Sequence, residues 1–300
     1  MDFLQVLLPI FGIFTLGFIG QKTIGFDTKN ISKMSLYLMS PVLTFQTFYT
    51  NALSMTYVYL GIFLLVLCFT IIGIVYLIGF IKKYPTNELC GMILASAFMN
   101  NGNYGTPVVL LVFGAMGLDI AIVLMVLQQL IMCTVGVYYA AKGSPEADGV
   151  RSAIRAVQRM PIMYGAALGV IFQYMSIPLS KPIQEAVSLV ASATIPTIMI
   201  VLGMQLANIK IKNLAIYKLS FSLSLKLLLS PVIAFIITLF LPVDDMTKQI
   251  MIIMAAMPSA ANTTMYALQF DTDTDFVSSA TLISTCLSLI TLPIVLSIVL

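Results

Sequence analysis

Between two apolar segments of the chain stands the polar stretch Asn100-Asn101-Gly102-Asn103-Tyr104-Gly105-Thr106-Pro107. Its flanks, residues 91–99 and 108–113, are apolar enough to lie in the hydrocarbon of a membrane. A continuous helix is not expected to pass through Pro107, because proline lacks an N–H and clashes with the carbonyl four residues earlier. Backbone groups freed at membrane depth are tolerated only inside protein or beside a wet cavity. We therefore predict a broken transmembrane helix, a device that transporters use to bind their substrates.

The composition of the chain indicates an integral membrane protein. Of its 300 residues, 60% are hydrophobic and 9% are charged, whereas a soluble domain contains roughly 25% charged residues. The long apolar runs lack period-2 alternation, which excludes an outer-membrane barrel. The chain contains no histidine, so imidazole metal ligation and histidine-based catalysis are excluded. The first apolar run has no basic flank or small-residue cleavage site, so we expect a span and not a cleaved signal peptide.

The apolar runs predict an all-α polytopic membrane protein with ten transmembrane helices. The first five spans cover residues 3–20, 31–51, 57–81, 88–113 and 118–141, and the second five cover 160–175, 183–206, 214–240, 247–269 and 276–299. Most approach the roughly 20 residues that cross a bilayer. The chain thus divides into a first five-helix repeat (1–141), a cytoplasmic loop (142–159) and a second five-helix repeat (160–300).

The basic residues between these spans predict the orientation. If the N-terminus faces outward, the outer loops contain only Lys181 and Lys248. The inner loops then contain twelve basic residues: Lys22, Lys29, Lys33, Lys82, Lys83, Lys142, Arg151, Arg155, Arg159, Lys210, Lys212 and Lys218. A bias of this size in short loops sets topology. We expect a multi-pass protein of the cytoplasmic (cell) membrane with both termini outside.

Similar features recur in the two halves of the chain. Proline occurs near the start of spans one and six (Pro9 and Pro161) and inside spans two and seven (Pro41 and Pro196). The broken stretch of span four is matched in span nine by Pro258-Ser259-Ala260-Ala261-Asn262-Thr263-Thr264. Since each half has an odd number of spans, the second enters the membrane in the opposite sense. We predict two inverted five-helix repeats whose helices four and nine are broken and cross each other.

The stretches at residues 100–107 and 258–263, together with the ten-span layout, resemble the auxin efflux carrier family, which includes prokaryotic relatives of the plant PIN carriers. The resemblance implies a fold shared with sodium–bile-acid symporters. Helices 1, 2, 6 and 7 would form a scaffold, and helices 3–5 and 8–10 a transport domain. The resemblance also implies export or exchange of a carboxylate anion, such as auxin or a malate- or malonate-type acid. The middle loop is much shorter than in the long plant carriers, which argues against regulation through its phosphorylation.

Amide and hydroxyl side chains at the two breaks form the predicted substrate site. Asparagine is a good helix cap and glycine permits positive φ, so a purely structural role is the alternative. N–H groups at the start of a half-helix favour a carboxylate, and amides add donors without a fixed cation that would hold the anion too tightly. The predicted substrate-binding residues are Asn100, Asn101, Gly102, Asn103, Gly105, Gln128, Ser259, Asn262, Thr263 and Thr264, and the predicted helix breakers are Pro107 and Pro258.

Two further polar features lie within predicted spans. Gln128 and Gln129 point about 100° apart on a helix, so we expect only one of them, Gln128, to face the crossover. Lys226 is the single cation well inside a span, and an intramembrane ionisable residue is a functional candidate by default. Snorkelling to the inner surface, or a later start of span eight, is the alternative for this lysine.

The acidic run Asp271, Asp273 and Asp275 follows span nine and alternates with threonine. It lacks the glycine turn and the bidentate glutamate of a calcium loop. We therefore expect a solvated loop that supplies the N-cap of span ten.

The coupling of transport is left open by the sequence. No acidic residue falls clearly inside a span, whereas proton relays normally use intramembrane Asp, Glu or His. Sodium coupling through freed carbonyls and polar side chains, and uniport driven by the membrane potential, both remain open. We expect no cofactor, with Na⁺ as the open coupling ion. The expected partners are a small carboxylate and the lipid bilayer, with no nucleic acid, and a homodimer is left open.

Other classes of function fit the sequence less well. The closest alternative is a sodium-coupled organic anion symporter of the bile-acid type, which has the same predicted fold. An ion channel is a remote alternative, because paired broken helices in an inverted repeat favour alternating access. A membrane-embedded hydrolase would need a Ser–His pair, two intramembrane aspartates or a histidine-rich metal motif, and the sequence has none of these. We therefore expect a transporter and not an enzyme.

Overall fold

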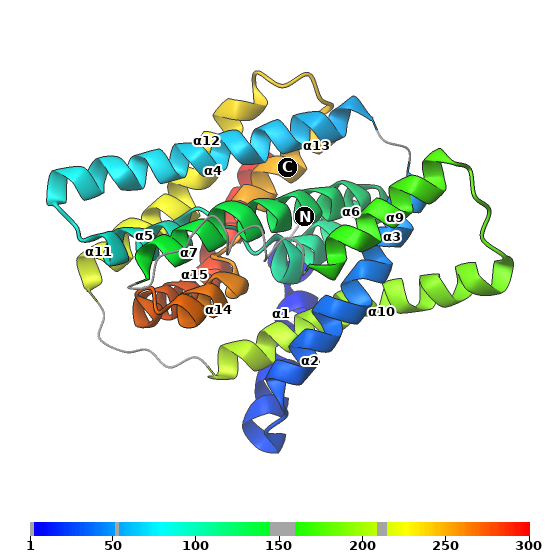
Figure 1. The fold of residues 1–300 in the computed structure, drawn as a ribbon, viewed down its shortest axis with the longest axis horizontal. Coiled ribbons are helices and arrows are strands. Elements are labelled where there is room, and N and C mark those ends of the chain that lie inside the picture. Colours follow the sequence, from blue (N-terminus) through cyan, green and yellow to red (C-terminus); the bar gives the residue numbers. More distant parts are fainter. Residues whose placement is uncertain (1–2, 52–53, 145–159, 209–214) are drawn as a thin grey trace. The chain divides into compact units, whose positions relative to one another are not determined.

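The computed structural model describes residues 3–51, 54–144, 160–208 and 215–300, and these residues form an all-helical protein, as predicted (Figure 1). Five of the described helical stretches are long and apolar enough to cross a membrane: Met55–Lys82, Asn101–Gly143, Lys181–Asn208, Ile216–Thr238 and Thr274–Val299. Leu8–Ile24 and Pro161–Tyr174 are shorter apolar helices. The count of ten spans and the inverted repeat stay predictions.

The stretch Asn101–Gly143 is too long for one span and changes direction at a glycine. It comprises η2 (Asn101–Gly105), α6 (Thr106–Ile131), η3 (Met132–Gly136) and α7 (Val137–Gly143). Gly114, inside α6, has φ 68° and ψ −157°, which is outside the helical region. Such a conformation is open to glycine because it has no Cβ. Gly114 lies between the predicted spans 88–113 and 118–141, so the residues on its two sides are separate helices.

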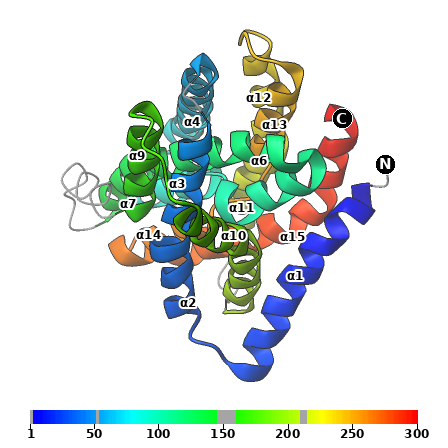
Figure 2. The same ribbon diagram turned by 90° about the vertical axis from the view of Figure 1, so that its right-hand side faces the viewer.

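One compact unit contains the described residues of Met1–Val58, Gly102–Val126 and Arg159–Asn208. In this first unit, α1 (Phe3–Ile24) packs along α10 (Lys181–Asn208), and α3 (Ser40–Thr50) packs along α9 (Pro161–Tyr174). Figure 1 shows α3 beside α9, and Figure 2 shows the same unit turned by 90°. The short helix α2 (Thr28–Met34) and the π-helical turn η1 (Ser35–Met39) precede α3. The unit thus joins helices from both halves of the chain.

Glycines allow these helix pairs to approach closely. A Cβ atom at Gly203 of α10 would overlap the carbonyl oxygen of Phe14 in α1, and one at Gly165 of α9 would overlap the carbonyl of Pro41 in α3. Small residues at such contacts are the usual means by which membrane helices pack, because lipid provides no hydrophobic drive for helices to associate. The first unit is therefore held by direct backbone-to-backbone packing.

The second unit contains the described residues of Tyr59–Asn101, Leu127–Gln158 and Ile209–Leu300. Most of α4 (Met55–Lys82) belongs to it, and α5 (Thr86–Ser96) packs against α7, α14 (Ala261–Phe270) and α15 (Thr274–Val299). The helices α11 (Ile216–Ser224) and α12 (Ser230–Thr238) are joined by the π-helical turn η4 (Leu225–Leu229), and α12 packs on α13 (Asp245–Ala255). All residues of α5 from Cys90 to Ser96 are buried, so α5 lies in the core of this unit.

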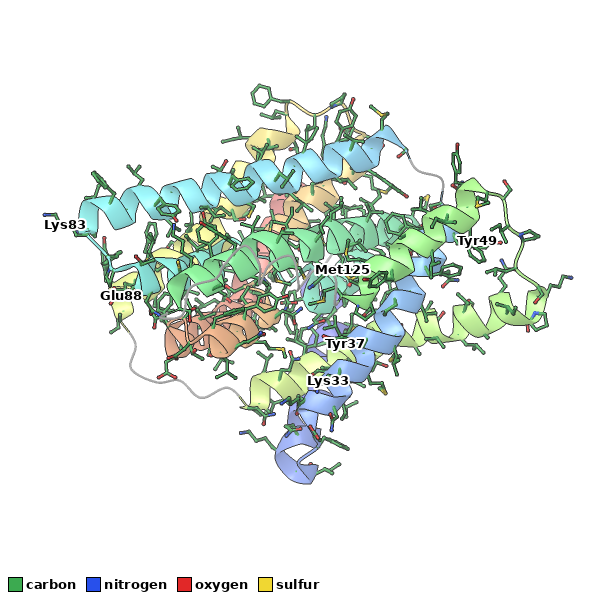
Figure 3. The ribbon with its side chains drawn as sticks, viewed as in Figure 1. Lys33, Tyr37, Tyr49, Lys83, Glu88 and Met125 are labelled. Atoms are coloured by element: carbon green, nitrogen blue, oxygen red, sulfur yellow. The ribbon has the colours of Figure 1, made fainter. Side chains whose placement is uncertain are left out.

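Polar contacts join the loops at one end of the second unit. Glu88, on the first turn of α5, forms an ion pair with Lys218 of α11. Figure 3 shows Glu88 at the same end of the unit as Lys83, which follows α4. Asn87 Nδ2 donates to the carbonyl oxygens of Gly143 (2.8 Å) and Asp271 (3.2 Å). These contacts hold the ends of α5, α7 and α14 together.

The acidic run lies in this polar end. Asp271 caps the C-terminus of α14 with φ 55°, and Asp273 is the N-cap residue of α15, as the sequence predicted. Asp271 and Asp275 are exposed, whereas Asp273 is half-buried, and burial raises the pKa of its carboxyl group. Within the described part of the chain, no three His, Cys, Asp or Glu side chains gather as metal ligands. The run therefore serves to end one helix and begin the next.

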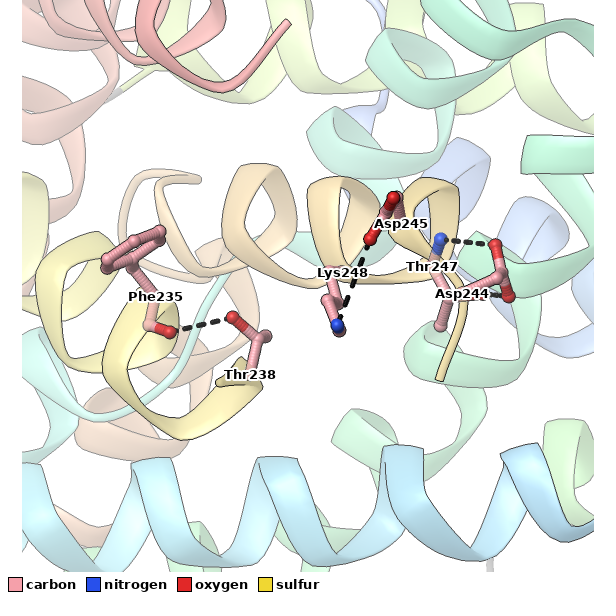
Figure 4. A network of polar contacts seen from close by, with 6 residues as sticks. All are labelled: Phe235, Thr238, Asp244, Asp245, Thr247 and Lys248. Atoms are coloured by element: carbon pink, nitrogen blue, oxygen red, sulfur yellow. Dashed lines mark hydrogen bonds and ion pairs between the residues drawn. The ribbon is translucent and has the colours of Figure 1, made fainter. Parts of the chain in front are cut away.

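An aspartate also begins α13. The carboxylate of Asp244 accepts hydrogen bonds from the backbone N–H of Thr247 (3.0 Å) and from its hydroxyl (2.6 Å), as Figure 4 shows. The hydroxyl bond of Thr247 is the main cause that lowers the pKa of Asp244. Such a cap supplies an acceptor for an N–H that has no partner within the helix.

Candidate functional site

Two interrupted segments meet within the second unit. The helix α5 ends at Ser96 and α13 ends at Ala255, and each is followed by a short non-helical stretch. Met99 and Ser259 form an isolated antiparallel bridge between these stretches. The N–H of Asn100 donates to the Pro258 carbonyl (2.9 Å), and the N–H of Ala260 donates to the Phe98 carbonyl (3.1 Å). Each stretch thus provides a hydrogen-bond partner for a backbone group of the other. Buried backbone groups outside a helix need such partners.

The two prolines occupy different places relative to these interruptions. Pro258 lies inside the non-helical stretch that follows α13. Pro107 is the second residue of α6, and the interruption precedes it at residues 97–100. Proline is tolerated in the first turn of a helix, because its missing N–H would have no helical partner there. The sequence predicted a break from Asn100 to Pro107, and the structure has non-helical backbone at residues 97–100 followed by the π-helical turn at Asn101–Gly105.

The hydroxyl groups near the second interruption bond to the protein itself. Ser259 is fully buried, its Oγ donates to the carbonyl of Ala95, and its N–H donates to Ser284 Oγ (3.1 Å). Thr263 Oγ1 donates to the carbonyl of Ala260 (2.7 Å). Thr264 Oγ1 donates to Thr281 Oγ1 of α15 at 3.2 Å. These three predicted site residues therefore hold the interrupted segments in place, with their hydroxyl protons already engaged.

The buried amides at the first interruption and on α6 lack such partners. Asn101 is 1% exposed, and neither its Nδ2 nor its Oδ1 has a hydrogen-bond partner in the described structure. The same holds for Asn100 Nδ2 and for both polar atoms of Gln128. A buried polar group without a partner costs about 1–3 kcal/mol, and folded proteins contain few of them. These amides are therefore free to bind a ligand beside the first interruption.

Gln129, and not the predicted Gln128, contacts a polar side chain at the start of α14. Asn262 Nδ2 lies 3.5 Å from Gln129 Oε1, and Gln129 Nε2 donates to Cys133 Sγ at 3.3 Å. Gln129 and Cys133 are four residues apart and so share a helix face. This i, i+4 spacing is a signal that the sequence itself contains. Gln128 as a substrate contact stays a prediction.

The start of α14 adds a further feature to the site. Its N-cap residue is Ala260, and no side chain among the described residues caps its first turn. The N-terminus of a helix carries free N–H groups and a partial positive charge, which favour an anion. The bridge between the two non-helical stretches places this N-terminus next to Asn100, whose Nδ2 has no partner among the described residues.

The other predicted site residues belong to the first unit. Gly102, Asn103 and Gly105 lie in the π-helical turn η2, where Thr106 Oγ1 donates to the Gly102 carbonyl. Tyr104, between them, is fully buried, and its ring lies 5.3 Å from that of Phe14. The structure thus brings together Asn100, Asn101, Gln128, Ser259, Asn262, Thr263 and Thr264 within one unit, and Gly102, Asn103 and Gly105 within the other.

Lys226 is fully buried in the second unit. It lies in η4, and its Nζ has no hydrogen-bond acceptor among the residues described. The turn η4 packs against α5 and α15. The lysine therefore does not snorkel to a surface, which was the alternative left open by the sequence. π-Helical turns inside α-helices occur frequently at functional sites.

The helical fold, its membrane-crossing stretches and the buried unpaired amides beside paired interruptions define a multi-pass membrane transport protein. The chain belongs to the auxin efflux carrier family: residues 2–153 and 149–296 match the family described as membrane transport protein. It is 30% identical to an "Uncharacterized transporter" of Methanothermobacter thermautotrophicus, over 93% of this chain and 90% of the relative. It is 22% identical to the "Putative malonate transporter" of Rhizobium meliloti, over 95% of this chain and 92% of the relative.

Proposed function

We propose that this protein is a secondary carrier that moves a small carboxylate anion across the cytoplasmic membrane, and that the anion binds at the paired interruptions of the second unit. The observation that carries the proposal is the buried, unpaired amide of Asn101, with Asn100 Nδ2 and Gln128 in the same state. A carboxylate accepts hydrogen bonds and would satisfy the donor atoms of these amides. The uncapped N-terminus of α14 favours the same charge.

The class of substrate follows from the chemistry of the donors. Neutral amides and helix N–H groups bind an anion without a neighbouring fixed cation, which suits release on the far side of the membrane. The name of the Rhizobium meliloti relative, a malonate transporter, agrees with a carboxylate. In this proposal the chain has ten spans in two inverted repeats, both termini outside, and exposes the site to each side in turn. If the anion crosses without a compensating ion, a negative interior drives its efflux at about 2.3 kcal/mol per charge per 100 mV.

A thermal-shift experiment tests the proposal on the purified full-length protein. The probes are acetate, malonate, malate and indole-3-acetate, each with Na⁺ or with choline as the counter-cation. A ligand that binds only the folded state stabilises it by RT ln(1 + [L]/Kd), or about 2.7 kcal/mol at a hundredfold excess over Kd. We expect at least one carboxylate to raise the melting temperature. Stabilisation that appears only with Na⁺ would instead support the sodium-coupled symporter.

Variants at the site provide the second part of the test. We expect Asn262→Ala and Asn101→Ala to abolish carboxylate flux into proteoliposomes while the proteins still express and fold. Ser297→Ala is the matched control, because its hydroxyl is exposed and bonds only to the Ile294 carbonyl of its own helix. Wild-type flux in both asparagine variants would show that the anion does not bind at the interruptions.

A further inference from the structure

Lys226 is a buried cationic group for which the carrier proposed above gives no role. Its side chain is 0% exposed, and no described residue offers its Nζ a hydrogen bond. A lone ammonium removed from water is among the most costly groups that a protein can bury, unless an anion accompanies it. A neutral amine at the same place carries a much smaller cost. The charge of Lys226 must therefore depend on what lies near it.

Lys226 is connected to the interrupted helices by a short path. Ser230 follows Lys226 by four residues, directly after η4. Ser230 Oγ donates to the carbonyl of Ala255 at 3.0 Å. Ala255 is the last residue of α13, directly before the second interruption. The turn that contains Lys226 also packs against α5, which ends at the first interruption. The first interruption thus follows a helix that packs on η4, and the second follows a helix that packs on α12, which continues η4.

The helix ends distribute charge in a way that suits an ion pair. The C-terminal ends of α5 and α13 carry partial negative charge, which favours an ammonium group. The N-terminus of α14, on the other side of the second interruption, favours a carboxylate. A cation and an anion held on opposite sides of the same bridge would stabilise each other across a region of low dielectric constant. Neither ion has a comparable partner when the other is absent.

The remaining titratable groups around Lys226 do not supply its counter-charge. The elements packed against η4 contain Glu88 and Cys90 on α5, Asp275 and Cys286 on α15, and Tyr217 and Lys218 on α11. Glu88 is paired with Lys218 at the polar end of the unit, and Asp275 is exposed there. Cys68 of α4 interacts electrostatically with Lys226, but a buried thiol is ordinarily neutral.

We propose that Lys226 is the proton-binding group of this carrier: it takes up one proton when a carboxylate binds at the interruptions and releases it when the anion leaves. The lone pair of the amine accepts the proton from water, and the resulting ammonium balances the charge of the anion. On release of the anion the proton returns to water, so anion and proton cross together. This inference rests on the proposed carboxylate transport. By linkage, protonation must favour anion binding as strongly as the anion favours protonation.

Isothermal titration calorimetry tests this proposal on the purified full-length protein between pH 7 and 9. Carboxylates are fully ionised in that range, so any proton exchange belongs to the protein. The probes are the same four carboxylates, titrated in two buffers of different ionisation enthalpy, which reports the number of protons taken up. We expect uptake that rises toward one proton per anion with increasing pH. The affinity should fall as pH rises, by at most about tenfold per pH unit for one linked proton.

Three variants separate the outcomes. Lys226→Arg keeps a charge that does not titrate in this range, so it should bind the anion with no proton uptake and no dependence on pH. Lys226→Met should bind at least tenfold more weakly and take up no proton. Cys68→Ala is the matched control, and we expect it to behave as the wild type.

Each contrary outcome has a distinct meaning. Anion binding to the wild type without proton uptake at any pH overturns this inference and leaves carboxylate transport standing. Proton uptake that persists in Lys226→Arg, or disappears in Cys68→Ala, assigns the proton to another group. If none of the four carboxylates binds at all, the proposed function and this inference both fail.

Discussion

Replacement of Asn101 by leucine tests whether the unpaired polar groups of the site bind a ligand or only stabilise the fold. Asn101 is 1% exposed, and both polar atoms of its amide lack partners in the described part of the chain. Leucine has the same branching at Cγ and no polar atom to desolvate. Relief of a buried unpaired polar group is worth about 1–3 kcal/mol. We therefore expect Asn101→Leu to raise the stability of the ligand-free protein while it abolishes carboxylate binding.

Ser259→Ala is the matched comparison, because it lies in the same bridge and is bonded. Its Oγ donates to the buried carbonyl of Ala95, so the substitution leaves that acceptor short of a partner. We therefore expect Ser259→Ala to lower the free energy of unfolding by about 1–3 kcal/mol, whereas Asn101→Leu should raise it. Thermal unfolding of the two purified variants, with and without carboxylate, measures both effects. If Asn101→Leu were destabilised as much as Ser259→Ala and still transported normally, Asn101 would be structural and the assignment of the site would be wrong.

Two further predictions concern stability. Gly203→Ala should destabilise the protein by about 1–3 kcal/mol, a typical cost of overpacking, because the new Cβ would overlap the backbone of Phe14. Gly12→Ala is the control, since nothing lies within 4 Å of a Cβ at that position. Equal melting temperatures of the two variants would contradict close packing of α1 on α10. Asp244→Ala should cost about 1 kcal/mol at neutral pH through loss of the helix cap. Since the folded protein lowers the pKa of Asp244, that stabilisation is present above the unfolded value of about 4 and is lost as pH falls through the lower folded value. The melting temperatures of wild type and variant should therefore converge on acidification, and a constant difference down to pH 3 would refute the assignment.

Much of the fold could be predicted because segments that cross a membrane must be apolar, and such segments are visible in the sequence. Long apolar runs must be helical in lipid, since helices satisfy their own backbone groups. The interruption after α13 was predicted from Pro258 and the polar residues around it. The first break was predicted at residues 100–107 with Pro107 as a helix breaker, whereas Pro107 lies in the first turn of α6. Proline is compatible with the first turn of a helix, so its position indicates where a helix begins as well as where one ends.

The detailed pairing of side chains could not be predicted from sequence. Gln128 and Gln129 are chemically identical and adjacent, and only the rotation of their helix decides that Gln129 contacts Asn262. The burial of Lys226 likewise depends on which neighbours cover η4. Snorkelling and burial are equally compatible with a lysine inside an apolar run.

The glycine contacts of the first unit bear on how this chain is made. The α1 helix packs against α10, and α3 packs against α9. In each pair the second helix is synthesised more than a hundred residues after the first. Until then the face that will pack against the later helix is in contact with lipid or with other components of the membrane. Long-range pairing of this kind slows folding and prolongs exposure of unpaired surfaces. The yield of this protein in a cell is therefore expected to depend on how quickly ribosomes complete the second half of the chain.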